Sequence, residues 1–500
     1  METVKMRSNR EATMHLNVST TGKHPVSPYL AMQFMEPLGA ADSSVDAAWD
    51  YVHETWRGDL LDTVRSLGPG MIRWGGCFAS YYHWREGVGP MEERRPMLNL
   101  CWDGLYSNHV GTKEFVDFCR QTGAEPLFVF NMESDGRMRW AYPRAGEDRF
   151  GTAEEAAAWV RYCNDPDDEL RRRHDPSGPY GVRWWQIGNE TSYDKNGYDL
   201  KRAADATVRF AEAALKADPG LSLIAWGDSG WAPAMCEAVG DSVSHIAFHC
   251  HYGSALPDSP LYDTEYRRDP ARTWEHLMSV PAVLDQKIRE MKEQVAPYGK
   301  RLAMTEGHFA LRGRNRCDVL SSWMAGVVYA RNFNVILRHS DVLDIATMAD
   351  FFGNRWQVNA VMIPTPHGSG KPYLQPVGQI MRLFGKTAGD DYADVQCGDG
   401  ADVTAGIRGD TVYLHVVNPS MTAPLSLTVT LDGRTPAGGM TVREIAPEDP
   451  AMEITPQNPH CFDPVTRTVP GNAVTLPPAA VAVVEIPLAA APDLFNATAN

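Results

Sequence analysis

The stretch VRWWQIGNE at residues 182–190 decides the fold, because a short apolar run ends there abruptly in Gly-Asn-Glu. Strands that are buried on both faces of a parallel sheet have this nearly continuous apolar character. Similar runs recur along the chain before and after it. We therefore expect eight strands, at residues 29–34, 71–74, 125–131, 182–188, 221–226, 245–252, 302–306 and 342–348.

Amphipathic stretches separate these runs, with apolar residues at helical spacing. They cover residues 45–67, 112–122, 152–164, 200–218, 270–295 and 319–337. Thr152 and Glu155 form a capping-box pattern at one helix start. Strand and helix alternation of this kind predicts an α/β fold, a (β/α)8 TIM barrel, which we place at residues 24–388.

The last part of the chain has a different pattern. Residues 411–417, 425–431 and 481–486 alternate apolar and polar positions, and Gly, Pro and Asn turns separate them. No long helical pattern follows residue 389. We therefore expect a C-terminal antiparallel β-sandwich, jelly-roll-like, at residues 389–490, with residues 10–20 adding a strand.

Composition limits the function classes. The chain of 500 residues carries 63 Asp and Glu against 47 Lys and Arg, a net charge of −16, which argues against a nucleic-acid or membrane partner. It contains no run of about 18 apolar residues, and its N-terminus lacks the apolar core of a secretory signal. Nine cysteines occur without a CxxC pair, so we expect reduced thiols in the cytoplasm.

Polar residues end several expected strands, where the active site of such a barrel lies. Glu190 ends the fourth strand and Glu306 the seventh. Glycoside hydrolysis needs such a pair, because one carboxyl group protonates the leaving oxygen while the other attacks or activates water. The run His249-Cys250-His251 does not predict zinc, because adjacent strand residues point to opposite faces and no fourth ligand is evident. We expect no metal and no cofactor.

Several longer motifs together resemble glycoside hydrolase family 51, the α-L-arabinofuranosidases. The segment PYGVRWWQIGNE at residues 179–190 is similar to the acid/base motif of that family. The resemblance extends, in the same order, over most of the chain. Its other segments are IRWGGCFASYYHW (72–84), GVGP (87–90), NHVGTKEF (108–115), GAEP (123–126), AWVRYCN (158–164), VVNP (416–419) and LPPA (476–479).

The resemblance implies a retaining hydrolase with Glu190 as acid/base and Glu306 as nucleophile. It also implies that Asn189 hydrogen-bonds the sugar 2-hydroxyl, and that Glu36 and His249 line the sugar pocket. The substrate implied is a neutral oligosaccharide. Members of the family commonly form homo-oligomers, so the resemblance also allows self-association of this chain.

The sequence departs from the family pattern at pocket positions. Cys77 stands where the family usually carries Asn, His251 where it carries Tyr, and Trp356 where it carries Gln. Gly307 and His308 follow the expected nucleophile in place of the usual Trp-Asn. The residues expected to bind substrate are therefore Glu36, Cys77, Asn189, His249, His251 and Trp356.

These departures leave the reaction class intact and the sugar open. The first interpretation is an exo-α-L-arabinofuranosidase acting on arabino-oligosaccharides. The second keeps the mechanism but changes the glycone to a D-galactofuranoside, a D-arabinofuranoside or a β-glucan. A third, a non-catalytic carbohydrate-binding protein, is disfavoured because both carboxylates are present. An extra loop at residues 137–150 is either a wall of the pocket or a surface insertion.

Overall fold

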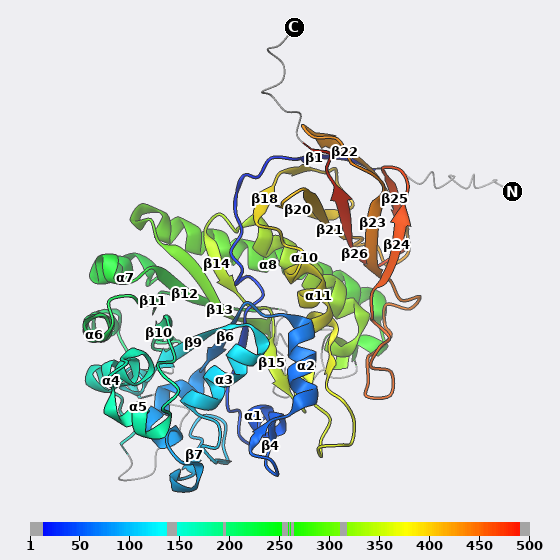
Figure 1. Ribbon diagram of the computed structural model, residues 1–500. Helices are drawn as coiled ribbons and strands as arrows, with labels where there is room; N and C mark the ends of the chain where they lie inside the picture. The colour runs from blue at the N-terminus through cyan, green and yellow to red at the C-terminus, as the bar shows by residue number, and fades with distance from the viewer. Residues whose placement is uncertain are drawn as a thin grey trace, which may run out of the picture.

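The computed structural model describes residues 14–137, 148–193, 197–252, 259, 261, 265–310 and 318–490 (Figure 1). Eight strands form one sheet in which every neighbouring pair is parallel. In sheet order they are β14 (Leu343–Ala346), β13 (Arg301–Phe309), β12 (His245–Tyr252), β11 (Ser222–Trp226), β10 (Trp184–Ile187), β9 (Glu125–Phe130), β6 (Met71–Trp74) and β3 (Gln33–Met35).

The sheet closes on itself between its two edge strands. The amide of Met32 donates to the carbonyl of Ala346 at 2.9 Å, and the amide of Ala346 donates to the carbonyl of Tyr29 at 3.1 Å. Tyr29 also forms a parallel bridge with Ile345. The predicted (β/α)8 barrel is therefore confirmed, since backbone pairing is continuous around it.

A separate apolar cluster fills the barrel interior on the N-terminal side of the polar layer. It takes buried side chains from seven of the eight strands and from Met32, which precedes β3: Met32, Met71, Leu127, Trp184, Ile224, Trp226, Ala247, Ala303 and Ile345. Side chains two positions further along a strand share its face. The next interior layer is polar, because Arg73 follows Met71, Gln186 follows Trp184 and His249 follows Ala247.

Helices cover the outside of the barrel (Figure 1). Thr152 caps one of them as predicted, because its hydroxyl accepts the amide of Glu155 at 3.2 Å. Three described helices, α5, α7 and α11, lie in segments for which the sequence predicts no helix. The helices are α1 (Ser44–Ala48), α2 (Gly58–Leu67), α3 (Thr112–Thr122), α4 (Ala153–Asn164), α5 (Glu169–His174), α6 (Leu200–Ala217), α7 (Ala232–Val239), α8 (Pro270–Val295), α10 (Trp323–Arg338) and α11 (Pro376–Gly385).

The single helix expected at residues 45–67 is wrong. Helix α1 ends at Ala48, and a small hairpin of β4 (Trp49–Asp50) and β5 (Thr55–Trp56) separates it from α2. The carboxylate of Asp50 accepts the amides of Val52 and His53 at 2.9 and 3.2 Å, which stabilises the turn. The apolar spacing of residues 45–67 fits this hairpin as well as a helix, because Trp49 and Trp56 pack against each other across the hairpin.

Two sheets pack into the sandwich above the barrel (Figure 1). One core joins them, with Leu16 and Leu427 from the first sheet and Leu414 and Val484 from the second. The first sheet has the order β19 (Val395–Gln396), β1 (Met14–Ser19), β22 (Leu425–Asp432) and β25 (Ala473–Leu476). The second has the order β2 (His24–Pro25), β18 (Asp391–Ala393), β20 (Asp402–Arg408), β21 (Thr411–Val417), β26 (Val481–Pro487), β23 (Met440–Ile445) and β24 (Val465–Val469).

One pairing in the sandwich differs from the antiparallel expectation. Strand β1 pairs parallel with β22, while the other sandwich pairs are antiparallel. Hairpins force neighbouring strands to run antiparallel. Because the whole barrel lies between β1 and β22 in the chain, no hairpin fixes their relative direction.

The barrel and the sandwich share apolar and polar contacts. The indole of Trp323 on α10 donates to the carbonyl of Ala479 at 2.8 Å. Asp402 on β20 forms ion pairs with Arg331 and Arg338 of the same helix. None of the described helices combines the length and the apolar character that a membrane crossing requires.

Candidate active site

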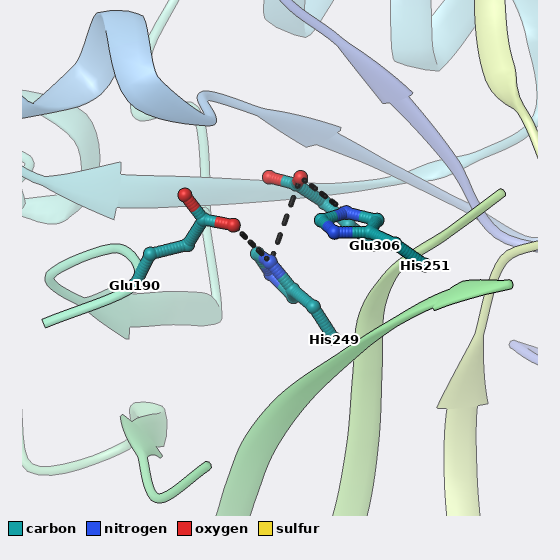
Figure 2. A group of neighbouring side chains, drawn as sticks. All are labelled: Glu190, His249, His251 and Glu306. Carbon is teal, nitrogen blue, oxygen red and sulfur yellow. Dashed lines mark hydrogen bonds and ion pairs between the residues drawn. The ribbon is translucent and has the colours of Figure 1, made fainter. Parts of the chain in front are cut away.

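Two carboxylates and two imidazoles meet at the C-terminal end of the barrel (Figure 2). Glu190 lies in the loop after β10, His249 and His251 lie on β12, and Glu306 lies on β13. One donor atom from each of the four side chains lies within 4.8 Å of the other three. Both carboxylates are buried, with Glu190 3% and Glu306 7% exposed. The structure therefore brings together the two glutamates that the strand ends predicted.

A β-bulge aims Glu306 into the barrel. The pairing register between β12 and β13 shifts after Phe248, so that His249 pairs with Glu306 and Thr305 is the extra residue. Strict alternation from the interior residue Ala303 would instead point Thr305 inward and Glu306 outward. A bulge re-aims the side chain that follows it. The nucleophile candidate thus depends on an irregularity that the sequence pattern does not reveal.

Glu190 is positioned by an unusual backbone conformation. Its φ is +54°, and Gly188, two residues earlier, has φ of +71°. A non-glycine residue in this region is strained and is found preferentially at functional positions. A carboxyl oxygen of Asp135 accepts the amide of Asn189 at 3.2 Å and so helps to fix the turn.

Arg73 anchors the polar layer beneath both glutamates. This fully buried side chain donates to Glu306 Oε1 at 2.8 Å, to Asn189 Oδ1 at 2.6 Å and to Gln186 Oε1 at 3.0 Å. A planar guanidinium can satisfy several acceptors in fixed directions. Because Arg73 binds the oxygen of Asn189, the amide nitrogen of Asn189 is directed away from Arg73.

The neighbours of Glu306 keep it ionised. Burial would raise the pKa of its carboxyl group, but positively charged and hydrogen-bonding neighbours lower it more. These are His249, with Nδ1 3.5 Å from Glu306 Oε2, then His251 at 3.8 Å, and Arg73. The pKa of Glu306 therefore lies well below its ordinary value, as an attacking carboxylate requires.

His249 lies between the two glutamates. Its Nδ1 is 3.1 Å from Glu190 Oε1, and its Nε2 is 3.1 Å from the hydroxyl of Thr305. The indole of Trp226 packs edge-on against the ring at a centroid distance of 4.5 Å. The imidazole is thus held on three sides and can bridge both carboxylates, as Figure 2 shows.

Glu36 and Cys77 also lie at this site. Glu36 accepts the amide of Phe78 at 2.6 Å and the indole N–H of Trp102 at 2.8 Å. Burial, and next the charge of Glu306, raise the pKa of Glu36 to about 8. The thiol of Cys77 is 3.7 Å from Glu190 Oε2. Both side chains therefore lie beside the carboxylate pair, and their contact with a sugar stays a prediction.

The amide nitrogen of Asn189 is 3.9 Å from Cys77 Sγ, which sets these two side chains next to each other.

Trp356 is connected to the site through Trp102. It lies in the loop between β15 (Asp350–Gly353) and β16 (Asn359–Met362), strands that the sequence analysis missed. Its ring packs edge-on against Trp102 at a centroid distance of 5.5 Å.

Sequence reasoning missed several residues of the site. Arg73 had a usable signal, since an arginine inside a short apolar strand is buried only with partners. Trp102 lies in a loop without any local pattern. Asp135 is buried against Ser80, and burial raises the pKa of Asp135 to about 8. Of the extra loop at 137–150, residues 138–147 lie outside the described part of the chain.

Comparisons with known proteins find similarity to α-L-arabinofuranosidases. Two sequence models match the chain, "Alpha-L-arabinofuranosidase 1 domain" over residues 63–268 and "Alpha-L-arabinofuranosidase C-terminal domain" over residues 316–480. A "Probable alpha-L-arabinofuranosidase C" of Aspergillus fumigatus is 34% identical over 184 residues, 35% of this chain and 33% of the relative. An "Intracellular exo-alpha-(1->5)-L-arabinofuranosidase" of Streptomyces lividans is 30% identical over 252 residues, 45% of this chain and 35% of the relative.

The matched region spans about a third of the length of these relatives. Solved structures extend the likeness of fold to nearly the whole chain. A family 51 α-L-arabinofuranosidase from Bifidobacterium longum superposes with a TM-score of 0.79 at 20% identity, covering 95% of this chain and 100% of the other. The α-L-arabinofuranosidase from Thermotoga maritima gives 0.75 at 23% identity, with the same coverage. The two models of α-L-arabinofuranosidase domains together match most of the barrel and of the sandwich, and so the chain belongs to the α-L-arabinofuranosidase family.

Proposed function

We propose that the protein is a retaining exo-α-L-arabinofuranosidase that releases terminal arabinofuranose from arabino-oligosaccharides. The observation that carries this proposal is the buried carboxylate pair at the barrel mouth, with one oxygen of Glu190 within 4.8 Å of one oxygen of Glu306. Retaining enzymes hold their carboxyl groups about 5–5.5 Å apart, whereas inverting enzymes need about 6.5–9.5 Å for a water molecule. The spacing favours double displacement.

In the first step Glu306 attacks the anomeric carbon. The glycosidic C–O bond breaks, and Glu190 gives its proton to the leaving oxygen. In the second step Glu190 takes a proton from water, whose oxygen displaces Glu306 from the same carbon and restores the anomeric configuration. The low pKa of Glu306 and its hydrogen bond from Arg73 support its assignment as the ionised partner.

The remaining pocket residues have chemistry suited to a furanose. The amide nitrogen of Asn189 lies beside the carboxylate pair and is a donor for the sugar 2-hydroxyl. Glu36, with its raised pKa, is protonated at neutral pH and can both donate to and accept from a sugar hydroxyl. Trp102 holds it in place.

We also infer a role in cytoplasmic arabinan degradation. The name of the Streptomyces lividans relative, an intracellular exo-acting enzyme for α-(1→5) linkages, supports this location and this substrate.

The test separates the roles of the two glutamates. Glu306→Ala should abolish turnover of nitrophenyl α-L-arabinofuranoside, because no glycosyl-enzyme can form. Glu190→Ala should still react with a dinitrophenyl glycoside, and added azide should restore turnover as a glycosyl azide of the same anomeric configuration. Oligosaccharides, with poor leaving groups, should lose about 10²–10⁴-fold in rate. Glu212→Ala, an exposed glutamate on α6, is the matched control.

Azide rescue of the Glu306 variant with the anomer of the substrate, and no rescue of the Glu190 variant, would reverse the two roles. An inverted product by NMR would refute double displacement altogether.

A second candidate function keeps this mechanism on another glycone. It is favoured by the thiol of Cys77 beside Glu190 and by the Trp102–Trp356 pair behind Glu36. A thiol is a poor hydrogen-bond partner for a hydroxyl, so the pocket has fewer polar contacts than an asparagine would give. A panel of nitrophenyl D-galactofuranoside, D-arabinofuranoside and β-glucoside beside the L-arabinofuranoside decides between the two.

A further inference from the structure

The four side chains of Figure 2 have a composition that sugar hydrolysis alone does not require. Two carboxylates and two imidazoles are the ligands that Zn²⁺ and related divalent cations prefer. We propose that Glu190, His249, His251 and Glu306 bind one such cation at the mouth of the barrel. Binding of the cation excludes the sugar, and this second statement rests on the proposed function.

The spacing of the donor atoms fits tetrahedral coordination. Zinc–ligand distances of about 2.0–2.1 Å place neighbouring donors about 3.4 Å apart. His249 Nδ1 is 3.1 Å from Glu190 Oε1 and 3.5 Å from Glu306 Oε2, and His251 Nε2 is 3.8 Å from Glu306 Oε2. The widest separation among the four donors is within 4.8 Å. Rotamer adjustments of these side chains would bring the wider pairs to that distance.

The groups behind these donors suit metal binding. A ligating histidine normally gives its other ring N–H to an acceptor, and His249 Nε2 is 3.1 Å from the hydroxyl of Thr305. A ligating carboxylate is likewise anchored through its other oxygen, and Glu306 Oε1 accepts from Arg73 at 2.8 Å. These contacts orient both ligands before a cation arrives. The positive charge of Arg73 opposes binding and limits the affinity.

The two imidazoles differ in exposure to solvent. His249 is fully buried at its side chain, while the side chain of His251 is 29% exposed. A cation can therefore approach past His251. His249 and His251 share a strand face because they are two residues apart, and Cys250 between them packs into the outer apolar core. The second imidazole, of His251, stands where the family usually carries a tyrosine, so the set of four ligands is complete only because this chain departs from the family pattern there.

The test measures metal binding without any substrate. Untagged wild-type protein is titrated calorimetrically with ZnCl₂, and one site per chain is expected. His251→Phe removes one donor at similar size, and Glu306→Gln keeps the shape while removing a negative charge. Each should weaken Zn²⁺ binding by at least about tenfold. The two variants are independent, so a folding failure of one leaves the other to decide.

A surface cluster provides the control. His53 Nδ1 is 2.9 Å and His367 Nδ1 3.8 Å from the carboxylate of Asp50, the other place on the described surface where two imidazoles meet one carboxylate. His53→Ala should leave the Zn²⁺ affinity unchanged. The proposal is overturned if His53→Ala abolishes binding, or if His251→Phe and Glu306→Gln bind Zn²⁺ as the wild type does.

The kinetic arm separates this inference from the proposed function. Zn²⁺ should inhibit hydrolysis of nitrophenyl α-L-arabinofuranoside competitively, raising KM and leaving kcat unchanged. Binding of Zn²⁺ by a protein that hydrolyses none of the glycosides would support the metal site and refute the proposed function. Hydrolysis with purely non-competitive inhibition would refute the shared site and leave the proposed function standing.

Discussion

Replacing Arg73 with methionine tests the electrostatic argument for the nucleophile. The substitution removes a buried guanidinium at similar length and leaves three acceptors without their donor, on Glu306, Asn189 and Gln186. A hydrogen bond to a charged group is worth about 1.5–3 kcal/mol. If the bond to Glu306 acts in the transition state, kcat/KM should fall roughly 10- to 150-fold.

The pH profile gives the more specific readout. Arg73 is one of the groups that lower the pKa of Glu306. A nucleophile with a depressed pKa loses activity as the pH falls through that value, so removal of Arg73 raises the pKa and moves the acid limb of kcat/KM to higher pH. Arg73→Lys keeps the charge and should leave the acid limb near its wild-type position, although the bonds to Asn189 and Gln186 are weakened.

The assay is kcat/KM for nitrophenyl α-L-arabinofuranoside across the acid range, with circular dichroism of each variant to show that it is folded. Loss of a buried ion-pair partner costs about 3–5 kcal/mol of stability, so measurements belong at low temperature. An Arg73→Met variant whose rate is within about threefold of wild type, and whose acid limb does not move, would refute the argument.

Three further predictions concern specificity and stability. Cys77→Asn should preserve or improve kcat/KM on the L-arabinofuranoside, because an amide hydrogen-bonds better than a thiol; loss of activity by this variant beside an efficient wild type would show that the position does not have the expected role. Asp135 has a pKa raised to about 8, so it binds its proton more tightly in the folded state, and stability is lost as pH rises from its unfolded pKa near 3.8 towards 8. Asp135→Asn should therefore reduce the stability loss between pH 6 and 8 by up to about 1.4 kcal/mol per pH unit, measured by urea unfolding, and an unchanged slope would contradict this. Asp402→Ala should lower the free energy of unfolding, measured with urea, by about 2 kcal/mol or more, because Arg331 and Arg338 lose their partner between barrel and sandwich. Asp410→Ala, at an exposed ion pair, should lower it by less than about 1 kcal/mol. Equal losses in the two variants would show that Asp402 has no special role.

Periodicity located the regular elements well. The bounds expected at 71–74 and 245–252 are those of β6 and β12, and the ranges 112–122 and 270–295 are those of α3 and α8. These segments are buried on predictable faces, so local pattern and tertiary environment agree. The helix expected at 45–67 failed because an apolar stripe also fits a turn whose two tryptophans pack together.

The two glutamates were predictable from the ends of the apolar runs, but Glu306 lies within its strand and the geometry of the pair was not predictable. Strand β13 continues past Glu306 to Phe309, and the bulge at Thr305 sets which side chain enters the barrel. Contacts such as the bond from Trp102 to Glu36 join distant segments and leave no periodic trace. Such residues can be found only once the fold brings their segments together.

Two of the positions at which the sequence departs from the family pattern, Cys77 and Trp356, lie outside the barrel strands, whereas His251 lies on β12 beside Glu306. Arg73, on the second strand of the barrel, ties Glu306 and Asn189 together from within the barrel, where a change disturbs several partners at once. Cys77 begins a short 3-10 helix (Cys77–Tyr81) after that strand, and Trp356 lies in a loop beyond the eighth strand. A residue outside the barrel strands can change without altering the strand pairing that holds Glu306. Sugar preference can therefore shift in this chain while the carboxylate pair, fixed by the barrel, retains its chemistry.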